Sequence, residues 1–451
     1  MPSSSDFSSS IGLTRLSGFG AGDAASTLSI TLAPMLLLYF LTEYVHVDPW
    51  LGGVILAIPK LWDVLVDMPI GRYSDQLAAR MGGHLNVGMW SALGLVLLLP
   101  LTFLHPQLGP KPLLAMFFIS VQILQATCYT VFGVTNLALV VELASDSVQR
   151  NKLLTARNLG SYLATITLIV STPMLIRCCG EGERGYVSAT LIVAAAAALL
   201  FAWYFVTMRN APRQSTTLSA TSAGMSLRQC VASLIRNRAF LALIVVIVAL
   251  GAASGCINSL IAYLNKYLLG RRPEDLFVLA GPILIGSLVG LPLAVPVARR
   301  IGNSQVLRWG VIVLVVSFMG YWLGLVRNGL PVIIVGGAGY GIAGAAVSVA
   351  LMATMLDAAK SDQSGVPLGL YLGMILSAQK LGMSLGAMAS GGLLSIIGYQ
   401  AGAPMSSALH HSFAALSLAG PLGAMLIACV ALWLYRNHAS KSRQSAEYVR
   451  L

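Results

Sequence analysis

Long apolar runs recur along the whole chain, and each is long enough to cross a lipid bilayer. A hydrocarbon core about 30 Å thick needs about 20 residues of α-helix per crossing. Helices are also one of the two folds that satisfy their own backbone polar groups in lipid. We therefore predict an all-α polytopic membrane protein with twelve transmembrane helices. The twelve segments are 19–41, 50–74, 84–104, 112–143, 153–177, 186–208, 239–265, 275–298, 305–326, 330–356, 367–398 and 409–435.

The composition excludes the main soluble classes. Hydrophobic residues make up 57% of the 451 residues and charged residues only 10%, whereas a soluble chain carries about 25% charged residues. This argues against a soluble enzyme, a secreted disulfide scaffold and a disordered chain. The six cysteines lack metal-ligand spacing. The GxGxxG match at 339–344 lies inside an apolar run, so we interpret its glycines as helix-packing residues. We expect no enzymatic activity and no cofactor.

The basic residues predict the orientation of the chain. The formal net charge is +12, and in membrane proteins Lys and Arg collect in cytoplasmic loops. With both termini inside, nineteen of the 28 Lys and Arg residues fall in cytoplasmic stretches of the chain, including the inner ends of spans, and seven at the outer side, while Lys60 and Lys380 remain within the membrane. The Ser-rich start lacks the pattern of a signal peptide. We predict a multi-pass protein of the cell membrane, the inner membrane in a Gram-negative cell, with both termini cytoplasmic and no nucleic-acid partner.

The longest polar interval divides the segments into six and six. Its first part has linker composition, and its second part spaces apolar residues as in a short helix on the membrane surface. Short basic loops also follow the second segment of each half. These features resemble the major facilitator superfamily, in which two pseudo-symmetric halves alternately open a cavity between them. The predicted parts are a tail 1–18, a first half 19–208, a linker 209–238, a second half 239–435 and a tail 436–451.

A few charged residues lie inside the spans, where charge is costly and usually functional. Asp63 and Asp67 are four residues apart and share a helix face with Lys60. Two carboxylates this close repel each other, and a bound cation, a proton or a lysine ammonium relieves that repulsion. We predict a site for Na⁺, Li⁺ or H⁺, with a buried structural ion network as the alternative. Lys380 lies within another span.

Asp75 lies at the inner end of its span rather than within it. There it is expected to cap a helix end or to pair with Arg80. We assign Asp75 and Arg80 a gating role.

The residues themselves resemble one family, the glycoside–pentoside–hexuronide:cation symporters. The resemblance rests on WDVLVD at 62–67 followed by GRYSD, on QKLG at 379–382, on GFGAGD at 18–23 and on the stretch from Asn136 to Gly160. It implies that Asp63 and Asp67 ligate Na⁺, Li⁺ or H⁺, that Lys60 precedes them and that Lys380 approaches this site as a compensating charge.

The same resemblance concerns the solute. It implies that Asp23 contacts sugar hydroxyls and that Arg157 lines the substrate cavity. We also assign Asn136 and Gln379 to the substrate-binding group. No metal is expected beyond a possible Na⁺ at the two aspartates.

Segment 112–143 departs from the family pattern. Gly133 and Leu137 stand where the best-known member of the family has an aspartate and a tryptophan for the sugar. The coupling residues are thus kept while the sugar pocket is altered. A hexuronide, another small glycoside and a non-sugar metabolite all remain open as substrates.

Three functions are compatible with these residues. The first is a secondary active transporter that couples H⁺ or Na⁺ to the symport of a small polar solute, and we expect it to work as a monomer. The second is a metabolite or drug exporter of the same fold that works as a proton antiporter. The third is a non-transporting assembly factor, which would have no reason to keep charge inside the membrane.

Overall fold

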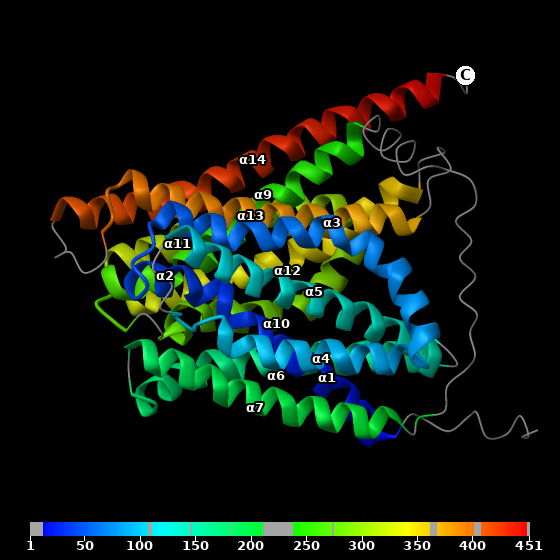
Figure 1. The fold of residues 1–451 in the computed structure, drawn as a ribbon. Coiled ribbons are helices and arrows are strands. Elements are labelled where there is room, and N and C mark those ends of the chain that lie inside the picture. The colour runs from blue at the N-terminus through cyan, green and yellow to red at the C-terminus, as the bar shows by residue number, and fades with distance from the viewer. Residues whose placement is uncertain are drawn as a thin grey trace, which may run out of the picture. The chain divides into compact units, whose positions relative to one another are not determined.

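The computed structural model describes residues 12–106, 111–144, 147–180, 182–209, 211, 238–272, 275–360, 368–400 and 407–448. Within these ranges the chain is helical along most of its length, and no strand occurs there (Figure 1). The first half contributes α1 (Leu13–Leu32), the π-helical turn η2 (Ala33–Leu37), α2 (Leu38–Glu43), α3 (Pro49–Met81), α4 (His84–Leu101), α5 (Lys111–Leu143), α6 (Ser147–Cys178) and α7 (Gly182–Arg209). The second half contributes α9 (Arg238–Tyr267), α10 (Leu276–Ile301), α11 (Asn303–Val326), α12 (Leu330–Lys360), α13 (Leu368–Ile396) and α14 (Ser407–Tyr448).

Each predicted segment lies on one helix, with α1, η2 and α2 together forming the first span. Among the described residues, 11 helical spans are long and apolar enough to cross a membrane. Helix α13 lies where the segment 367–398 was predicted and has a similar length, but it carries Lys380, Gln379 and many small residues, which lower its hydropathy. Several helices continue past the apolar segments, and α14 runs on to Tyr448 through most of the predicted C-terminal tail. Hydropathy marks only the part of a helix that meets lipid.

A proline interrupts the first span without ending it. Pro34 has no backbone N–H to donate to the preceding turn, and residues Ala33–Leu37 form a π-helical turn between α1 and α2. Such local widening is a common way for a helix to absorb a proline or to bend.

The contacts between helices follow the same pattern in two compact units. In the first, which comprises residues 1–45 and 65–220, α1 packs against α6 and α7, and α4 packs against α5 and α7. In the second, which comprises residues 46–64 and 221–451, α9 packs against α13 and α14, and α11 packs against α12 and α14. In both halves, therefore, the first span packs against the fifth and sixth, and the third span packs against the fourth and sixth. The beginning of α3, through Val64, groups with the second unit.

Glycines allow the helices to approach closely. A Cβ atom on Gly286 of α10 would collide with the backbone of Ala338 on α12, and one on Gly341 would collide with the carbonyl oxygen of Ile283 on α10. Small residues at such crossings let two backbones pack in van der Waals contact. The GxGxxG match at 339–344 is therefore a helix-packing segment, as predicted.

We expect Gly286→Val to destabilise the protein by about 1–3 kcal/mol, the usual cost of forcing extra atoms into a packed contact. Gly423→Val is the matched control, because a Cβ atom there meets nothing within 4 Å. The two substitutions change helix propensity equally, so the melting temperature in detergent isolates the packing effect. Equal melting temperatures would contradict the assigned role of the α10–α12 crossing.

Candidate cation and solute sites

One buried carboxylate and two lysines form a charge cluster inside the second unit. Asp63 lies on α3 within an apolar span and is 1% exposed. Its Oδ2 atom lies 3.6 Å from Nζ of Lys380 on α13 and 3.9 Å from Nζ of Lys60, one helical turn earlier on α3. The predicted approach of Lys380 to Asp63 is therefore present. Both ammonium groups converge on a single carboxylate oxygen.

Small residues position the two helices of this cluster. On the N-terminal side of Asp63, Gly53 of α3 packs directly against Gly391 and nearby carbonyl oxygens of α13. Ser384 donates a hydrogen bond to the carbonyl oxygen of Ala57 at 3.2 Å, and the backbone N–H of Trp50 donates to Oγ of Ser395 at 3.0 Å. These contacts hold α13 close enough to α3 for a lysine to reach the aspartate.

The burial of the three charged groups is unequal. The side chain of Asp63 is 2% exposed, whereas those of Lys380 and Lys60 are 26% and 35% exposed. When all three are ionised they carry a net charge of +1, so a further carboxylate would balance the cluster. Asp67 lies one turn further along α3, although its side chain lies outside the described part of the chain. A monovalent cation or a proton that reaches Asp63 must compete with the two ammonium groups.

A second charged pair lies in the first unit. Nε of Arg157 on α6 donates a hydrogen bond to Oδ1 of Asp23 on α1 at 2.8 Å. Asp23 is 8% exposed. The helices cross closely here, because a Cβ atom on Gly160 would collide with the carbonyl oxygen of Gly20. Two of the four residues that the sequence assigned to solute binding are thus paired with each other.

Asn136 lies deeper than a solute-contacting residue needs to be. It is 1% exposed, and its Oδ1 atom accepts a hydrogen bond from the hydroxyl of Tyr204 on α7 at 2.9 Å. Tyr204 also packs on Phe19 and Phe132, so it joins α7 to α1 and α5. Asn136 therefore orients an aromatic residue of the core. Its contact with solute stays a prediction.

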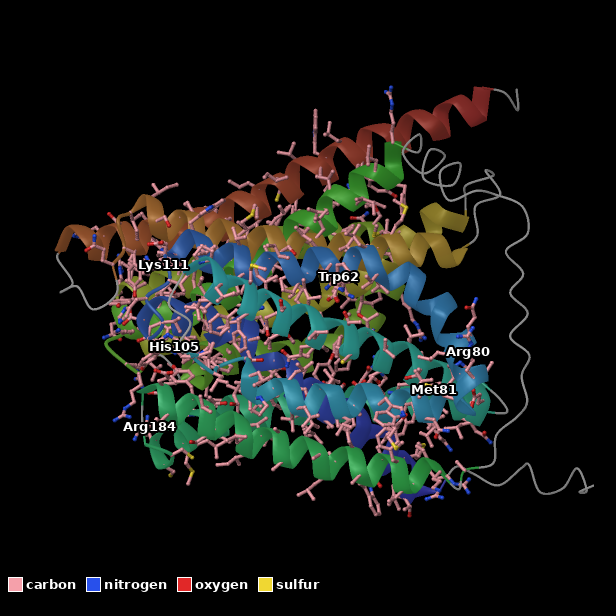
Figure 2. All side chains as sticks on the ribbon, viewed as in Figure 1. Trp62, Arg80, Met81, His105, Lys111 and Arg184 are labelled. Atoms are coloured by element: carbon pink, nitrogen blue, oxygen red, sulfur yellow. The ribbon has the colours of Figure 1, made fainter. Side chains whose placement is uncertain are left out.

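The remaining predicted residues are spread along α3 and α13. Gln379 is exposed and lines a cavity within the second unit. Figure 2 shows Trp62 midway along α3 and Arg80 near its end. The side chain of Asp75 lies outside the described residues, so the gating pair of Asp75 with Arg80 stays a prediction.

One polar contact was missed in the sequence. Nδ1 of His84, at the start of α4, lies 2.6 Å from Oε1 of Glu142, near the end of α5. Both side chains are largely buried. Each residue sits at a predicted helix end, but no spacing rule connects them, because the loop between α4 and α5 decides which ends meet.

Comparison with known proteins identifies the family. A sequence model of the MFS/sugar transport protein family matches residues 18–438. The chain belongs to this family. It is a multi-pass membrane transporter of small molecules and not an enzyme, as predicted, and its family fits the resemblance found in the sequence.

The sequence relatives are distant, and two of them match almost the whole chain. The isoprimeverose transporter of Lactiplantibacillus pentosus is 21% identical over 429 residues, which are 93% of this chain and 87% of the relative. The glucuronide carrier protein homolog of Escherichia coli (strain K12) is 21% identical over 431 residues, or 93% and 91% of the two chains. An uncharacterized symporter of Bacillus subtilis (strain 168) is 22% identical over 280 residues, or 61% and 60%.

Solved structures confirm the major facilitator fold. The nucleoside transporter NupG superposes with a TM-score of 0.67 at 13% identity, covering 94% of this chain and 99% of NupG. A bacterial homolog of the human lysosomal transporter Spinster, in an inward-facing and occupied conformation, gives a TM-score of 0.69 at 12% identity, covering 94% and 96%. At these identities the likeness concerns the fold alone.

The charge cluster predicts that the two lysines differ in importance. Lys380→Ala should lower the free energy of unfolding by about 1–3 kcal/mol. This is less than the ~3–5 kcal/mol lost when a buried charge is left fully unpaired, because Lys60 still lies near Asp63. Lys60→Ala should cost less, since Lys60 is farther from Asp63 and more exposed. Combining Lys380→Ala with Asp63→Asn should be less damaging than the sum of the single changes. Additive losses of melting temperature in detergent would mean that the two residues do not interact.

Proposed function

We propose that this protein is a secondary active transporter that couples a monovalent cation, H⁺ or Na⁺, to the symport of a small polar solute by alternating access. The observation that carries the proposal is the convergence of two lysine ammonium groups on one oxygen of a buried carboxylate within a membrane span. A charge placed there is costly, and a structural scaffold has no need of it.

The coupling role follows from competition at Asp63. A cation that binds the carboxylate displaces an ammonium group, and Lys380 returns when the cation leaves. Asp63 thereby keeps a positive partner throughout, which lowers the cost of reorienting a carrier without its cation. Carboxylate oxygens suit Na⁺, and the same carboxylate can accept H⁺, so one site serves either ion.

The paired Asp23 and Arg157 serve the solute in this proposal. Their side chains present carboxylate acceptors and guanidinium donors whose geometry is already set by the 2.8 Å hydrogen bond between them. Charge-assisted hydrogen bonds of this kind hold hydroxyl groups well. The distant relatives are named for isoprimeverose and a glucuronide, and we propose a sugar or glycoside as the solute class.

The remaining features of the proposal concern placement in the cell. The protein lies in the cell membrane, the inner membrane in a Gram-negative cell, with both termini cytoplasmic and two six-helix halves joined by the linker 209–238. It functions as a monomer.

A proton-coupled exporter is the second candidate. Leu137 of α5 is 45% exposed at the position where the best-known member of the family that the sequence resembles has a tryptophan for the sugar. An apolar side chain there favours a less polar solute. The direction of solute movement under an inward proton gradient decides between the two candidates. An antiporter expels solute as protons enter, whereas a symporter accumulates solute together with the protons.

Removing either aspartate should abolish accumulation. We expect Asp63→Asn and Asp67→Asn proteoliposomes to lose uptake of isoprimeverose or methyl β-D-glucuronide driven by a proton or Na⁺ gradient, because the amide binds a cation or proton far more weakly. Asp48→Asn, at an exposed carboxylate just before α3, is the control for charge loss and should accumulate solute normally. Unchanged concentrative uptake in both aspartate variants would falsify the assignment.

The Asp23–Arg157 pair should govern affinity rather than coupling. Arg157→Gln should raise KM at least about tenfold, the effect of losing one or two charge-assisted hydrogen bonds, while the cation requirement remains. Since this change also leaves Asp23 without its guanidinium, the double variant Asp23→Asn with Arg157→Gln should recover melting temperature without recovering KM. Recovery of both would show that the pair is purely structural.

A further inference from the structure

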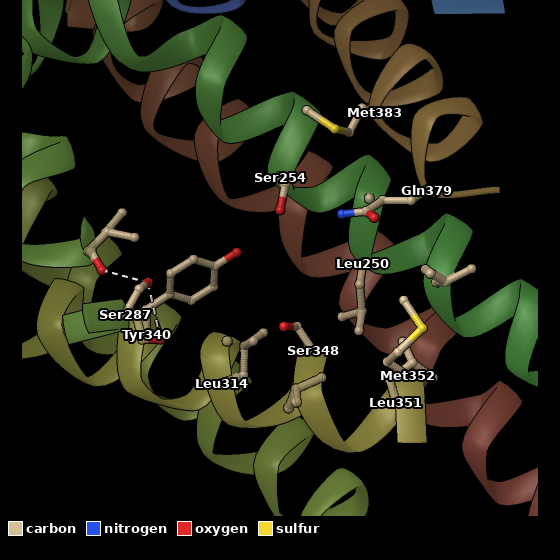
Figure 3. A pocket seen from close by; sticks show the side chains of 16 residues that line it. Leu250, Ser254, Ser287, Leu314, Tyr340, Ser348, Leu351, Met352, Gln379 and Met383 are labelled. Atoms are coloured by element: carbon tan, nitrogen blue, oxygen red, sulfur yellow. Dashed lines mark hydrogen bonds between the residues drawn. The ribbon is translucent and has the colours of Figure 1, made fainter. Parts of the chain in front are cut away.

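A cavity of about 360 Å³ lies among five helices of the second unit (Figure 3). Its walls come from α9, α10, α11, α12 and α13. Small-molecule sites typically occupy about 300–1,000 Å³, so this cavity suits a single ring better than a larger ligand. All of its lining residues belong to the second unit.

Polar and apolar side chains both line the cavity. The polar tips of Ser254, Tyr340, Ser348 and Gln379 turn toward the same space in Figure 3. The apolar part of the lining consists of leucine and methionine side chains, among them Leu250, Leu314, Leu351, Met352 and Met383. None of the described residues that line the cavity is Asp, Glu, Lys, Arg or His. Such a lining matches a neutral ring that carries both hydroxyl groups and apolar C–H groups.

The polar groups are not equally available to a ligand. Ser287 donates its hydroxyl to the carbonyl oxygens of Ile283 and Gly341, at 2.9 and 3.3 Å, so it is engaged by the helices. Ser254 on α9 and Tyr340 on α12 direct their hydroxyl groups toward the cavity (Figure 3). Ser348 and Gln379 are exposed to the cavity. The amide of Gln379 and the hydroxyl groups of Ser348 and Tyr340 are thus the donors and acceptors that a ligand can reach.

An internal repeat relates this cavity to the charged pair of the first unit. The segment TARNLG at 155–160 corresponds to SAQKLG at 377–382, and DAAS at 23–26 corresponds to GAAS at 251–254. The backbone contacts agree with this alignment, because Gly160 packs on Gly20 and Gly382 packs on Val248 at the equivalent place. Gln379 therefore stands where the first unit has Arg157, and Gly251 stands where it has Asp23.

The repeat explains why the lining of the cavity is uncharged and why the cavity has room for a ligand. In the first unit the helix crossing carries an ion pair. In the second, a glutamine and a glycine replace the two charged side chains, so the equivalent position keeps a hydrogen-bonding amide and loses a side chain. A polar, uncharged cavity results beside the same kind of crossing.

We propose that this cavity binds an uncharged, hydroxyl-bearing ring of the transported solute, with Gln379, Ser348 and Tyr340 as its hydrogen-bonding groups. The inference rests on the proposed function and specifies its substrate class as a neutral glycoside rather than a hexuronide at this position. A carboxylate would lose its hydration here without gaining a cationic partner. Gln379 also directly precedes Lys380, so the helix that contacts the ring carries the lysine that contacts Asp63.

The test measures equilibrium binding to the purified full-length protein in detergent, with no ion gradient. The probes are methyl β-D-glucopyranoside and methyl β-D-glucuronide, which differ only by the carboxylate. Gly344→Leu fills the cavity, because a Cβ atom there meets only Leu314 Cδ1, at 3.8 Å. Gly423→Leu, where a Cβ atom meets nothing within 4 Å, is the matched control. Tyr340→Phe removes one hydroxyl with little change of shape.

The neutral probe should bind the wild type and Gly423→Leu and should bind Gly344→Leu at least about tenfold more weakly. Tyr340→Phe should weaken binding about threefold to tenfold, the effect of one hydrogen bond, and the glucuronide should bind more weakly than the neutral probe throughout. The proposal is overturned if Gly344→Leu binds as the wild type does, or if the wild type binds the glucuronide more tightly than the neutral probe or binds neither. If binding follows the expected pattern while no gradient drives uptake, the pocket stands and the symport proposal fails.

Discussion

A carboxylate inside a membrane span is tolerated only next to a cation, and this constraint ties α3 to α13. Asp63 is 1% exposed, and an isolated charge at such a depth costs several kcal/mol. Lys380 and Lys60 reach the same carboxylate oxygen at 3.6 and 3.9 Å. Because Lys380 comes from another helix, the pair can form only where α13 passes close to α3. The small residues Gly53 and Gly391 provide that closeness, and the early part of α3 accordingly groups with the second unit.

The same helix crossing supports different chemistry in the two halves. Gly160 packs on Gly20 in the first unit and Gly382 packs on Val248 in the second, so the backbones meet in equivalent ways. The residues beside the crossings differ, with Asp23 and Arg157 in one unit and Gly251 and Gln379 in the other. A duplicated arrangement of helices thus carries a charged pair once and a neutral cavity once. The backbone contact constrains the small residues, which leaves the neighbouring positions free to vary.

The sequence predicted the helices better than the sites. Every predicted span after the first lies on one helix, and the first lies on α1, η2 and α2 together, because the length of an apolar run directly reflects the thickness of lipid that it crosses. The contact of Lys380 with Asp63 was also predicted, through the family resemblance and the cost of an isolated ammonium. Asn136 is 1% exposed and accepts a hydrogen bond from Tyr204, and its predicted contact with solute stays a prediction. The contact of His84 with Glu142 and the cavity at Tyr340 were not predicted at all. Nothing in the local sequence of α4 or α12 distinguishes these residues from ordinary polar residues of a helix.

The sequence by itself determined that this protein is a bundle of membrane helices and that certain charges must lie within it. Both properties depend only on the residues of a single helix, because its hydropathy and its charged residues can be identified without knowing which helices it contacts. Only the tertiary structure decided which polar groups meet. Asp23 with Arg157, Asp63 with Lys380, and the hydroxyl and amide groups around the cavity each come from different helices. Their meeting depends on the crossings of those helices, which glycines and other small residues set through contacts between segments far apart in the chain.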